Sequence, residues 1–129
     1  MNPVKQELDD KTLILIEKES GRKFQWQKKR IFMESKRILD LLNSENLKQE
    51  AIDQAVKHYA DVVKEFDDYV RTADDLTSGS SAYTSRPANL LSQVRDYRDA
   101  KKKKNNRQAV NAYNNAVQTY NHMVNFSNF

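Results

Sequence analysis

Apolar residues recur along this chain at intervals of three and four residues, the spacing that places side chains on one face of an α-helix. The most regular run alternates the two intervals without a break and comprises Ile52, Ala55, Tyr59, Val62, Phe66, Tyr69, Ala73 and Leu76. Charged residues fill the other faces, so the run predicts a long amphipathic helix packed in a bundle. Tyr59 and Phe66 are bulkier, and Ala73 is smaller, than leucine-zipper residues, which favours a globular antiparallel bundle over a parallel dimer.

Two segments before this run also predict helices. The first spans 3–21, and the second spans 23–43. Trp26 falls near the edge of the second segment's apolar stripe, which comprises Phe24, Ile31, Ile38, Leu39 and Leu42. In the turn that follows, Ser44 or Asn46 can cap the next helix, because either side chain accepts a hydrogen bond from a free backbone amide.

The second half of the chain predicts a loop and two helices. The stretch TSGSSAYTSRP, 77–87, is rich in serine and ends in proline, so we expect a loop there and a helix that starts near Ala88. That helix carries a stripe made of Leu90, Leu91, Val94 and Tyr97. The next stripe is out of phase with it, so a break near Asn105 and Asn106 is predicted. This last stripe comprises Ala109, Tyr113, Ala116, Tyr120 and Met123.

The closing helix carries no formal charge from Gln108 to Phe129. We expect its stripe to be a seam of the core rather than a binding surface, and to be widened by Val110, Val117 and Val124. The other faces are covered by five asparagines, Asn111, Asn114, Asn115, Asn121 and Asn125. A polar but uncharged helix suits a place between neighbours of both signs, or beneath a partner.

Composition agrees with a helical bundle. Two glycines and two prolines among 129 residues are too few for a strand-rich or a disordered chain. The predicted fold is therefore all-α, an antiparallel bundle of four to five helices with coiled-coil-like packing, in a single domain over 1–129.

Several chemistries can be set aside. The absence of cysteine excludes disulfides and thiolate catalysis, and no apolar run is long enough for a transmembrane segment. The amino terminus shows no signal-peptide pattern. No phosphate-binding loop, nucleophile elbow or zinc-protease motif occurs, so we expect no enzyme and no cofactor. His58 has too few carboxylates around it for a metal site, and His122 lies among asparagines, so no metal ligand or catalytic residue is assigned.

Net charge alternates along the chain, at −2, +5, −5, +6 and 0 over residues 1–21, 22–44, 45–77, 78–107 and 108–129. We interpret this alternation mainly as complementarity between neighbouring helices.

Two charged clusters remain candidate sites. The basic patch comprises Arg95, Arg98, Lys101, Lys102, Lys103, Lys104 and Arg107. It fits an anionic partner such as lipid headgroups or phosphates, and the alternative is a solvated helix end. The acidic face comprises Asp61, Glu65, Asp67, Asp68, Asp74 and Asp75. A solvated face opposite the basic helices is favoured over a weak divalent-cation site.

Three stretches taken in order resemble a known family: IEKESGRKFQWQ, then SGSSAY continued by LLSQVRDYRD, then AYNNAVQTYNHMV. They are similar to the carboxy-terminal half of the YiiG-like bacterial lipoproteins, whose domain has no assigned function. That family has a Glu-x-x-x-Gly-Lys/Arg-x-Phe element, a Leu/Tyr-rich basic helix after a small-residue loop, and a closing Tyr-Asn element. The matching residues are Glu17, Gly21, Arg22 and Phe24, then 80–97, then Tyr113, Asn114, Val117, Tyr120 and Asn121.

The resemblance implies an all-helical domain tethered in the bacterial cell envelope or periplasm, and it implies no activity. The family's lipoprotein leader and amino-terminal half are missing from this sequence, and KKKKNNR stands where the family has a longer insertion. We therefore expect either a shortened relative or a fragment of a longer lipoprotein.

Three functions fit these observations. The first is a non-enzymatic envelope domain that acts by binding an unidentified protein. The alternative is an immunity protein that neutralises a periplasmic toxin, with the acidic 45–77 segment masking a basic active site. The third is weak binding of nucleic acid or anionic lipid through 95–107. Nucleic acid is the less expected partner, because Tyr97 is the only aromatic residue near the patch on which a base could stack.

Overall fold

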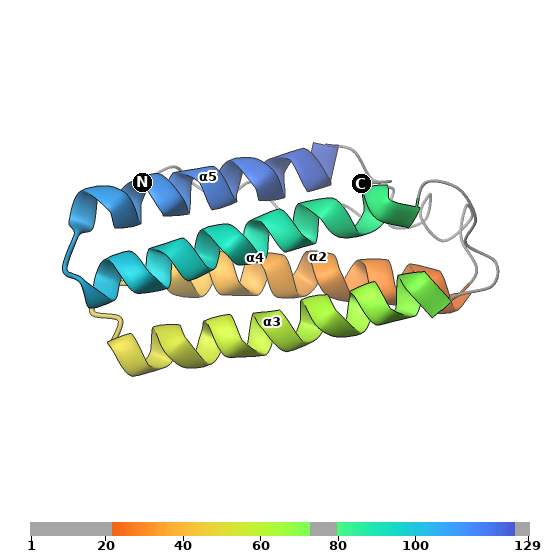
Figure 1. The fold of residues 1–129 in the computed structure, drawn as a ribbon, viewed down its shortest axis with the longest axis horizontal. Coiled ribbons are helices and arrows are strands. Elements are labelled where there is room, and N and C mark those ends of the chain that lie inside the picture. Colours follow the sequence, from red (N-terminus) through yellow and green to blue (C-terminus); the bar gives the residue numbers. More distant parts are fainter. Residues whose placement is uncertain (1–21, 73–79, 126–129) are drawn as a thin grey trace.

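The computed structural model describes residues 22–72 and 80–125, and within them the chain forms four helices that lie side by side (Figure 1). They are α2 (Arg22–Leu42), α3 (Gln49–Thr72), α4 (Ser80–Lys102) and α5 (Asn106–Asn125), and no strand occurs in these two ranges. The α2–α3 and α4–α5 turns lie at the same end of the bundle, so consecutive helices run antiparallel. The predicted all-α antiparallel bundle is confirmed, whereas the helix predicted over 3–21 lies outside the described residues.

The four helices form a ring in which each packs mainly against two neighbours, and α2 and α4 also touch across the ring. α4 packs most extensively against α5 and then against α3, and α2 closes the ring by contacting α3 and α5. Among the described helices, none is both long and apolar enough to cross a membrane.

The ring order places the acidic helix between the two basic ones. α3 carries six acidic and three basic residues, whereas α2 carries seven bases with two acids and α4 carries five bases with two acids. Ion pairs cross both interfaces: Arg30 of α2 contacts Glu65 of α3, and Lys102 Nζ of α4 lies 3.6 Å from Asp53 Oδ1 of α3. α5 lies between α4 and α2. The expectation that its neighbours carry both signs is therefore wrong, since both are basic.

The core is made of the apolar stripes that the sequence predicts. Their buried members are Ile31, Ile38, Leu39, Leu42, Ile52, Tyr59, Val62, Phe66, Leu90, Leu91, Val94, Tyr97, Ala109, Tyr113, Ala116, Tyr120 and Met123. Ala55 and Tyr69 are partly buried against them. Ala73, Leu76 and the side chain of Phe24 lie outside the described part of the chain.

Two helices differ from their predicted seams. On α3 the structure buries three further valines, Val56, Val63 and Val70, because this helix packs against α2 on one side and α4 on the other. On α5, Val117 is buried and Val124 packs against the core, but Val110 is 38 % exposed. The prediction for Val110 is wrong, because the buried stripe at the beginning of α5 is formed by Ala109 and Ala112, and Val110 lies beside it at the surface.

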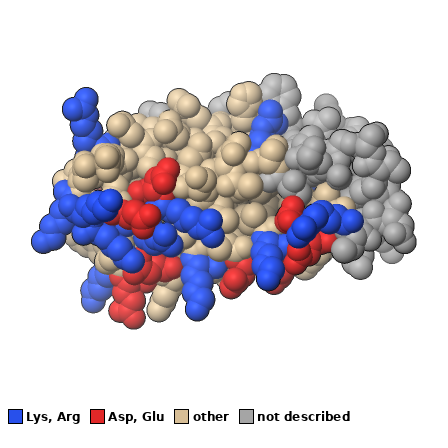
Figure 2. All heavy atoms as spheres, in the orientation of Figure 1, with Lys and Arg blue, Asp and Glu red and all other residues tan. Residues whose placement is uncertain are grey.

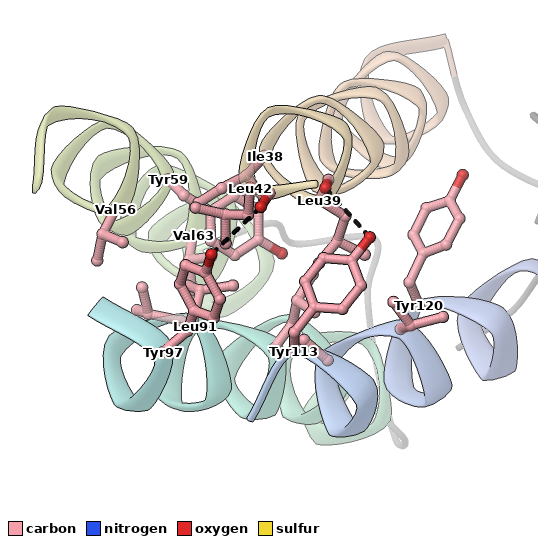
Figure 3. Packing of buried hydrophobic residues seen from close by; sticks show 14 of the residues in the cluster. Ile38, Leu39, Leu42, Val56, Tyr59, Val63, Leu91, Tyr97, Tyr113 and Tyr120 are labelled. Carbon is pink, nitrogen blue, oxygen red and sulfur yellow. Dashed lines mark hydrogen bonds between the residues drawn. The ribbon is translucent and has the colours of Figure 1, made fainter. Parts of the chain in front are cut away.

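Two buried tyrosines cover the end of α2 (Figure 3). Tyr97 Oη donates to the Leu42 carbonyl at 3.3 Å, and Tyr113 Oη donates to the Leu39 carbonyl at 3.5 Å. The two rings lie 6.2 Å apart and are tilted by 56°. Because the last carbonyls of a helix are only partly satisfied within it, these hydroxyl groups stabilise the buried end of α2 by joining it to α4 and α5.

α4 begins earlier than the sequence predicts. The expected loop is wrong over 80–87, and so is the expected start near Ala88, because α4 begins at Ser80 and contains Pro87. The rest of the expected loop, 77–79, lies outside the described residues. Proline removes the amide that would bond to the carbonyl four residues earlier, which costs about 3 kcal/mol in an exposed helix interior. Pro87 is buried, so packing of its ring offsets that loss.

The predicted break near Asn105 and Asn106 is confirmed. In this turn, backbone hydrogen bonds close the end of α4, and the Asn105 side chain caps the start of α5. Lys104 takes a left-handed conformation with φ of 57°. The Asn105 amide donates to the Ala100 carbonyl at 2.9 Å, and the Lys104 amide donates to the Lys101 carbonyl at 3.1 Å. This pair of bonds is a Schellman motif. Asn105 Oδ1 also accepts from the Gln108 amide at 3.2 Å, so Asn105 caps α5 as well.

The α2–α3 turn is built differently from the prediction. Ser44 Oγ donates back to the Asp40 carbonyl at 3.3 Å, and Asn46 has a left-handed φ of 58°. α3 starts only at Gln49, with the Ile52 amide bonded to the Lys48 carbonyl. The prediction that Ser44 or Asn46 caps α3 is therefore wrong, because the cap position belongs to Lys48.

Candidate functional site

The basic patch lies where α4 ends and α5 begins, at the end of the bundle that holds both turns (Figure 1). Two of its members are engaged by carboxylates: Arg98 Nε donates to Asp99 Oδ1 at 2.9 Å, and Lys102 pairs with Asp53. Lys101 is half-buried, and Lys102 is exposed although it is paired. The remaining members, Arg95, Lys103, Lys104 and Arg107, are exposed as well. The hydrogen bond from Arg98 holds the pKa of Asp99 below its usual value.

The surface around this patch carries both signs of charge. Figure 2 shows acidic side chains among the lysines and arginines at that end, while the surface over α5 is mainly uncharged. A groove of about 410 Å³ separates α4 from α5, where Asp96, Asp99 and Lys103 face Gln108 and two asparagines. Ligand pockets are mostly apolar with a few polar groups, and this groove is the reverse, so we assign no ligand to it.

Three of the four described members of the acidic face are paired with arginines within the chain. Glu65 contacts Arg30, and Arg71 Nη2 lies 3.0 Å from Asp67 Oδ2 and 2.8 Å from Asp68 Oδ1. Asp61 is exposed, and Asp74 and Asp75 lie outside the described residues. Within 22–72 and 80–125, no group of three or more histidines and carboxylates could hold a metal ion.

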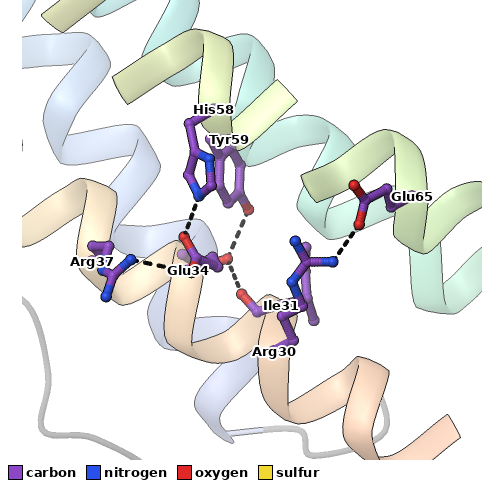
Figure 4. A network of polar contacts seen from close by, with 8 residues as sticks. Arg30, Ile31, Glu34, Arg37, His58, Tyr59 and Glu65 are labelled. Carbon is purple, nitrogen blue, oxygen red and sulfur yellow. Dashed lines mark hydrogen bonds and ion pairs between the residues drawn. The ribbon is translucent and has the colours of Figure 1, made fainter. Parts of the chain in front are cut away.

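A polar network joins α2 to α3 on the other side of the bundle (Figure 4). His58 Nε2 lies 2.9 Å from Glu34 Oε2, and Glu34 Oε1 lies 3.5 Å from Arg37 Nη1. Glu34 therefore accepts from two partners, one on each helix. His58 is exposed, as the sequence predicts, but its carboxylate partner comes from α2 and lies 24 residues away. His122 is exposed on α5.

Beside this network lies an apolar groove between α2 and α3, with a volume of about 320 Å³. Its apolar walls are Ile38, Leu41, Ala51, Ala55 and Tyr59. Its polar rim is made of Glu34, Arg37, Gln54 and His58. Ala51 and Ala55 lie four residues apart on α3, so this part of the α3 wall carries only methyl groups and leaves room for a side chain from outside.

The groove borders a set of side chains that we call the α2 outer face, namely the exposed Trp26, Met33, Arg37 and Leu41 and the half-buried Arg30. Met33 is 61 % exposed, Trp26 is 58 % exposed and Leu41 is 36 % exposed. The intervals of 7, 4 and 4 residues from Trp26 through Met33 and Arg37 to Leu41 place these four on one side of the helix, opposite the buried Ile31 and Leu39. Arg30 Cζ lies 5.8 Å from the Trp26 ring centroid, which is a cation–π distance.

Sequence reasoning did not identify the α2 outer face. It placed Trp26 near the edge of the buried stripe and gave no role to Met33 or Leu41. Helical spacing from Ile31 and Ile38 is the signal that separates these positions from the core.

Comparisons with protein-family models, curated proteins and solved structures find no match for this chain. The resemblance to the YiiG-like lipoproteins therefore stays a prediction, and functional inference rests on the surface of the bundle.

Proposed function

We propose that this chain is a non-enzymatic helical domain that acts by binding another protein through the α2 outer face. The proposal is supported mainly by the clustering of exposed apolar groups. Three of the four large apolar side chains that are exposed in the described residues lie on this face, and Val110 of α5 is the fourth. Single exposed apolar residues are common on soluble proteins, but a cluster marks an interaction surface.

The kinds of residue on this face support the same proposal. Tryptophan, methionine and arginine are enriched in protein–protein interfaces, and tryptophan and arginine dominate their binding energy. Burying a side chain such as Met33 beneath a partner contributes about 1.5–3 kcal/mol. Arg30 already lies against Trp26, so part of the face is ordered before a partner arrives.

Comparative capture tests the proposal. The full chain, a Trp26→Ala/Met33→Ala variant and a Val110→Ala control are used as baits in an extract of the cells that make the protein. We expect one partner to be retained by the parent chain and the control, and to be lost from the double variant. Equal retention by all three baits would contradict a role for the α2 outer face, provided that circular dichroism shows the same helix content.

We further propose that this binding occurs in the bacterial cell envelope, which rests on the family resemblance alone. Fractionation of cells that express the complete gene product tests this location. Recovery with the membrane or periplasmic fraction is the expected result, and recovery with the cytoplasm would remove this part of the proposal while leaving the protein-binding role intact.

A further inference from the structure

We infer that the α2 outer face and the α2–α3 groove together bind one amphipathic helix of a partner protein, with carboxylates beside its apolar stripe. This inference rests on the proposed protein-binding function and adds the chemistry of the partner. It follows from the shape, the length and the charge of the surface.

The shape fits a protruding side chain on a rigid partner. Leu41 belongs both to the α2 outer face and to the groove wall, so the groove and the face form one surface. The methyl groups of Ala51 and Ala55 line the opposite wall. An apolar side chain of an incoming helix can enter between them, in the way that side chains of one helix pack into the grooves of another.

The length fits about four turns of helix. Trp26 and Leu41 are separated by 15 positions on α2, which corresponds to about 22 Å at 1.5 Å per residue. A partner helix of about 15 residues that lies along α2 would therefore cover Trp26 and Met33 and reach the groove beside Leu41.

The positive charge of the surface favours a partner helix that carries carboxylates beside its apolar stripe. Lys29 and Arg37 are exposed beside the apolar residues, and 74 % of the Arg37 side chain is accessible. Two carboxylates of α2 lie near these bases, and both are paired within the helix bundle. Glu34 is held by His58 and Arg37 with only 17 % of its side chain accessible, and Asp40 Oδ2 lies 2.6 Å from Lys36 Nζ. Carboxylates on the partner would thus meet guanidinium and ammonium groups, which favours complex formation and speeds association.

The same charge argues against two other occupants. A second copy of this chain would bring two α2 helices together, each with seven bases and two acids, and like charges across an interface are unfavourable. An anionic lipid surface would match the bases, but a flat surface cannot fill the groove.

Trp26 is the only tryptophan in the chain, so its fluorescence reports directly on this surface. The full chain is titrated with a synthetic helical peptide of about 16 residues that lacks tryptophan, with leucines at heptad spacing flanked by glutamates. A matched peptide carries lysines in place of the glutamates. Vesicles of equal parts phosphatidylglycerol and phosphatidylcholine form the third arm.

We expect the acidic peptide to shift Trp26 emission to shorter wavelength with a micromolar Kd, and the basic peptide to bind at least about tenfold more weakly. Leu41→Gln should weaken the acidic peptide about tenfold, whereas Val110→Gln, a matched change at a similarly exposed position of α5, should not. Arg37→Gln should also weaken it, and Lys57→Gln, an exposed base on α3, should not.

Three results would overturn the inference: no shift with the acidic peptide at about 1 mM, equal or tighter binding of the basic peptide, or binding to the vesicles alone. If a protein partner is nevertheless lost from the Trp26→Ala/Met33→Ala bait, the proposed function stands and the assigned partner chemistry is wrong. If the acidic peptide binds but no partner depends on this face, the chemistry of the surface is right and the proposed function fails.

Discussion

Ser35 and Tyr59 show how single side chains hold α2 and α3 in register. Ser35 Oγ donates to the Ile31 carbonyl at 2.6 Å, so the Tyr59 hydroxyl supplies the hydrogen for the 2.7 Å bond between the two side chains. Both residues are buried, and no buried side-chain nitrogen or oxygen in the described residues lacks a partner. Removing one member of this pair leaves a buried polar group unsatisfied.

We therefore expect Ser35→Ala to lower the free energy of unfolding by about 1–3 kcal/mol, because the Tyr59 hydroxyl loses its acceptor. Adding Tyr59→Phe should cost less than the sum of the two single changes, because the second substitution removes the unsatisfied group. Urea unfolding of the four chains measures this coupling. Additive losses would show that the two hydroxyl groups do not interact.

Alkaline pH should destabilise the fold through Tyr59. Burial raises its pKa above the ordinary value of about 10. Its contribution to stability is then full below about pH 10 and is lost as pH rises, because the unfolded chain releases the proton first. We expect the free energy of unfolding to fall above about pH 10, and Tyr59→Phe to make the fall shallower by about 1.4 kcal/mol per pH unit. The free energy of unfolding is measured by urea unfolding across this pH range. If it falls equally steeply with pH in the parent chain and in Tyr59→Phe, the Tyr59 hydroxyl is not buried as described.

Lys104 occupies a backbone conformation that favours glycine. Its left-handed φ costs a non-glycine residue roughly 1–2 kcal/mol. Lys104→Gly should therefore raise the free energy of unfolding by about 1 kcal/mol, less the entropy that glycine adds to the unfolded chain. Lys101→Gly, inside α4, should lower it by about 1 kcal/mol. Thermal unfolding of both variants checks the opposite signs, and a loss for Lys104→Gly would rule out the Schellman geometry.

At the scale of whole elements, the sequence predicts helix ends well where they depend on local patterns. The break at Asn105 follows from two apolar stripes that are out of phase, so the end of α4 and the start of α5 are predictable. The start of α4 is not, because TSGSSAYTSRP describes local preference while the burial of Pro87 depends on distant packing. The α3 cap fails for a similar reason, since Ser44 bonds back to α2.

Asn105 caps α5 with its side chain, whereas its bond to the end of α4 comes from the backbone amide and is kept when the side chain is changed. Asn105→Ala removes the side-chain acceptor of the Gln108 amide, and we expect a loss of about 1–2 kcal/mol in the free energy of unfolding. Asn106→Ala, one position later and also exposed, should change it by less than about 0.5 kcal/mol. Similar losses at both positions in urea unfolding would show that Asn105 is not the cap.

At the scale of the molecule, charge alternation predicts that α3 lies between α2 and α4, but it leaves the place of α5 undetermined. The ring closes by packing α5 against α4 and α2, which are both basic. Beyond Arg107, α5 carries no lysine, arginine, aspartate or glutamate, so it adds little repulsion between them. Substitutions at the exposed Gln118 test this account. Gln118→Glu should be more stable than Gln118→Lys by about 0.5 kcal/mol, and the difference should vanish in about 1 M salt. Equal free energies of unfolding for the two variants at low salt would contradict this account of α5.

The candidate site could be predicted only in part. The stripe of Ile31 and Ile38 identifies the buried side of α2, and helical spacing then places Trp26 and Met33 on the opposite side. Sequence alone cannot show that α3, α4 and α5 leave them exposed, because that depends on the ring order. The α2–α3 groove was not predictable either, since its walls come from two helices whose register is set by contacts such as His58 with Glu34.

The central claim is that the α2 outer face contacts a protein partner, and site-specific photo-cross-linking in living cells tests it most directly. A photoreactive residue replaces the exposed Met33 in one chain and the exposed Gln118 of α5 in another. We expect a single discrete adduct from position 33, and none from position 118. Adducts of equal yield from both positions, or none from position 33 while position 118 reacts, would show that the contact surface lies elsewhere on the bundle.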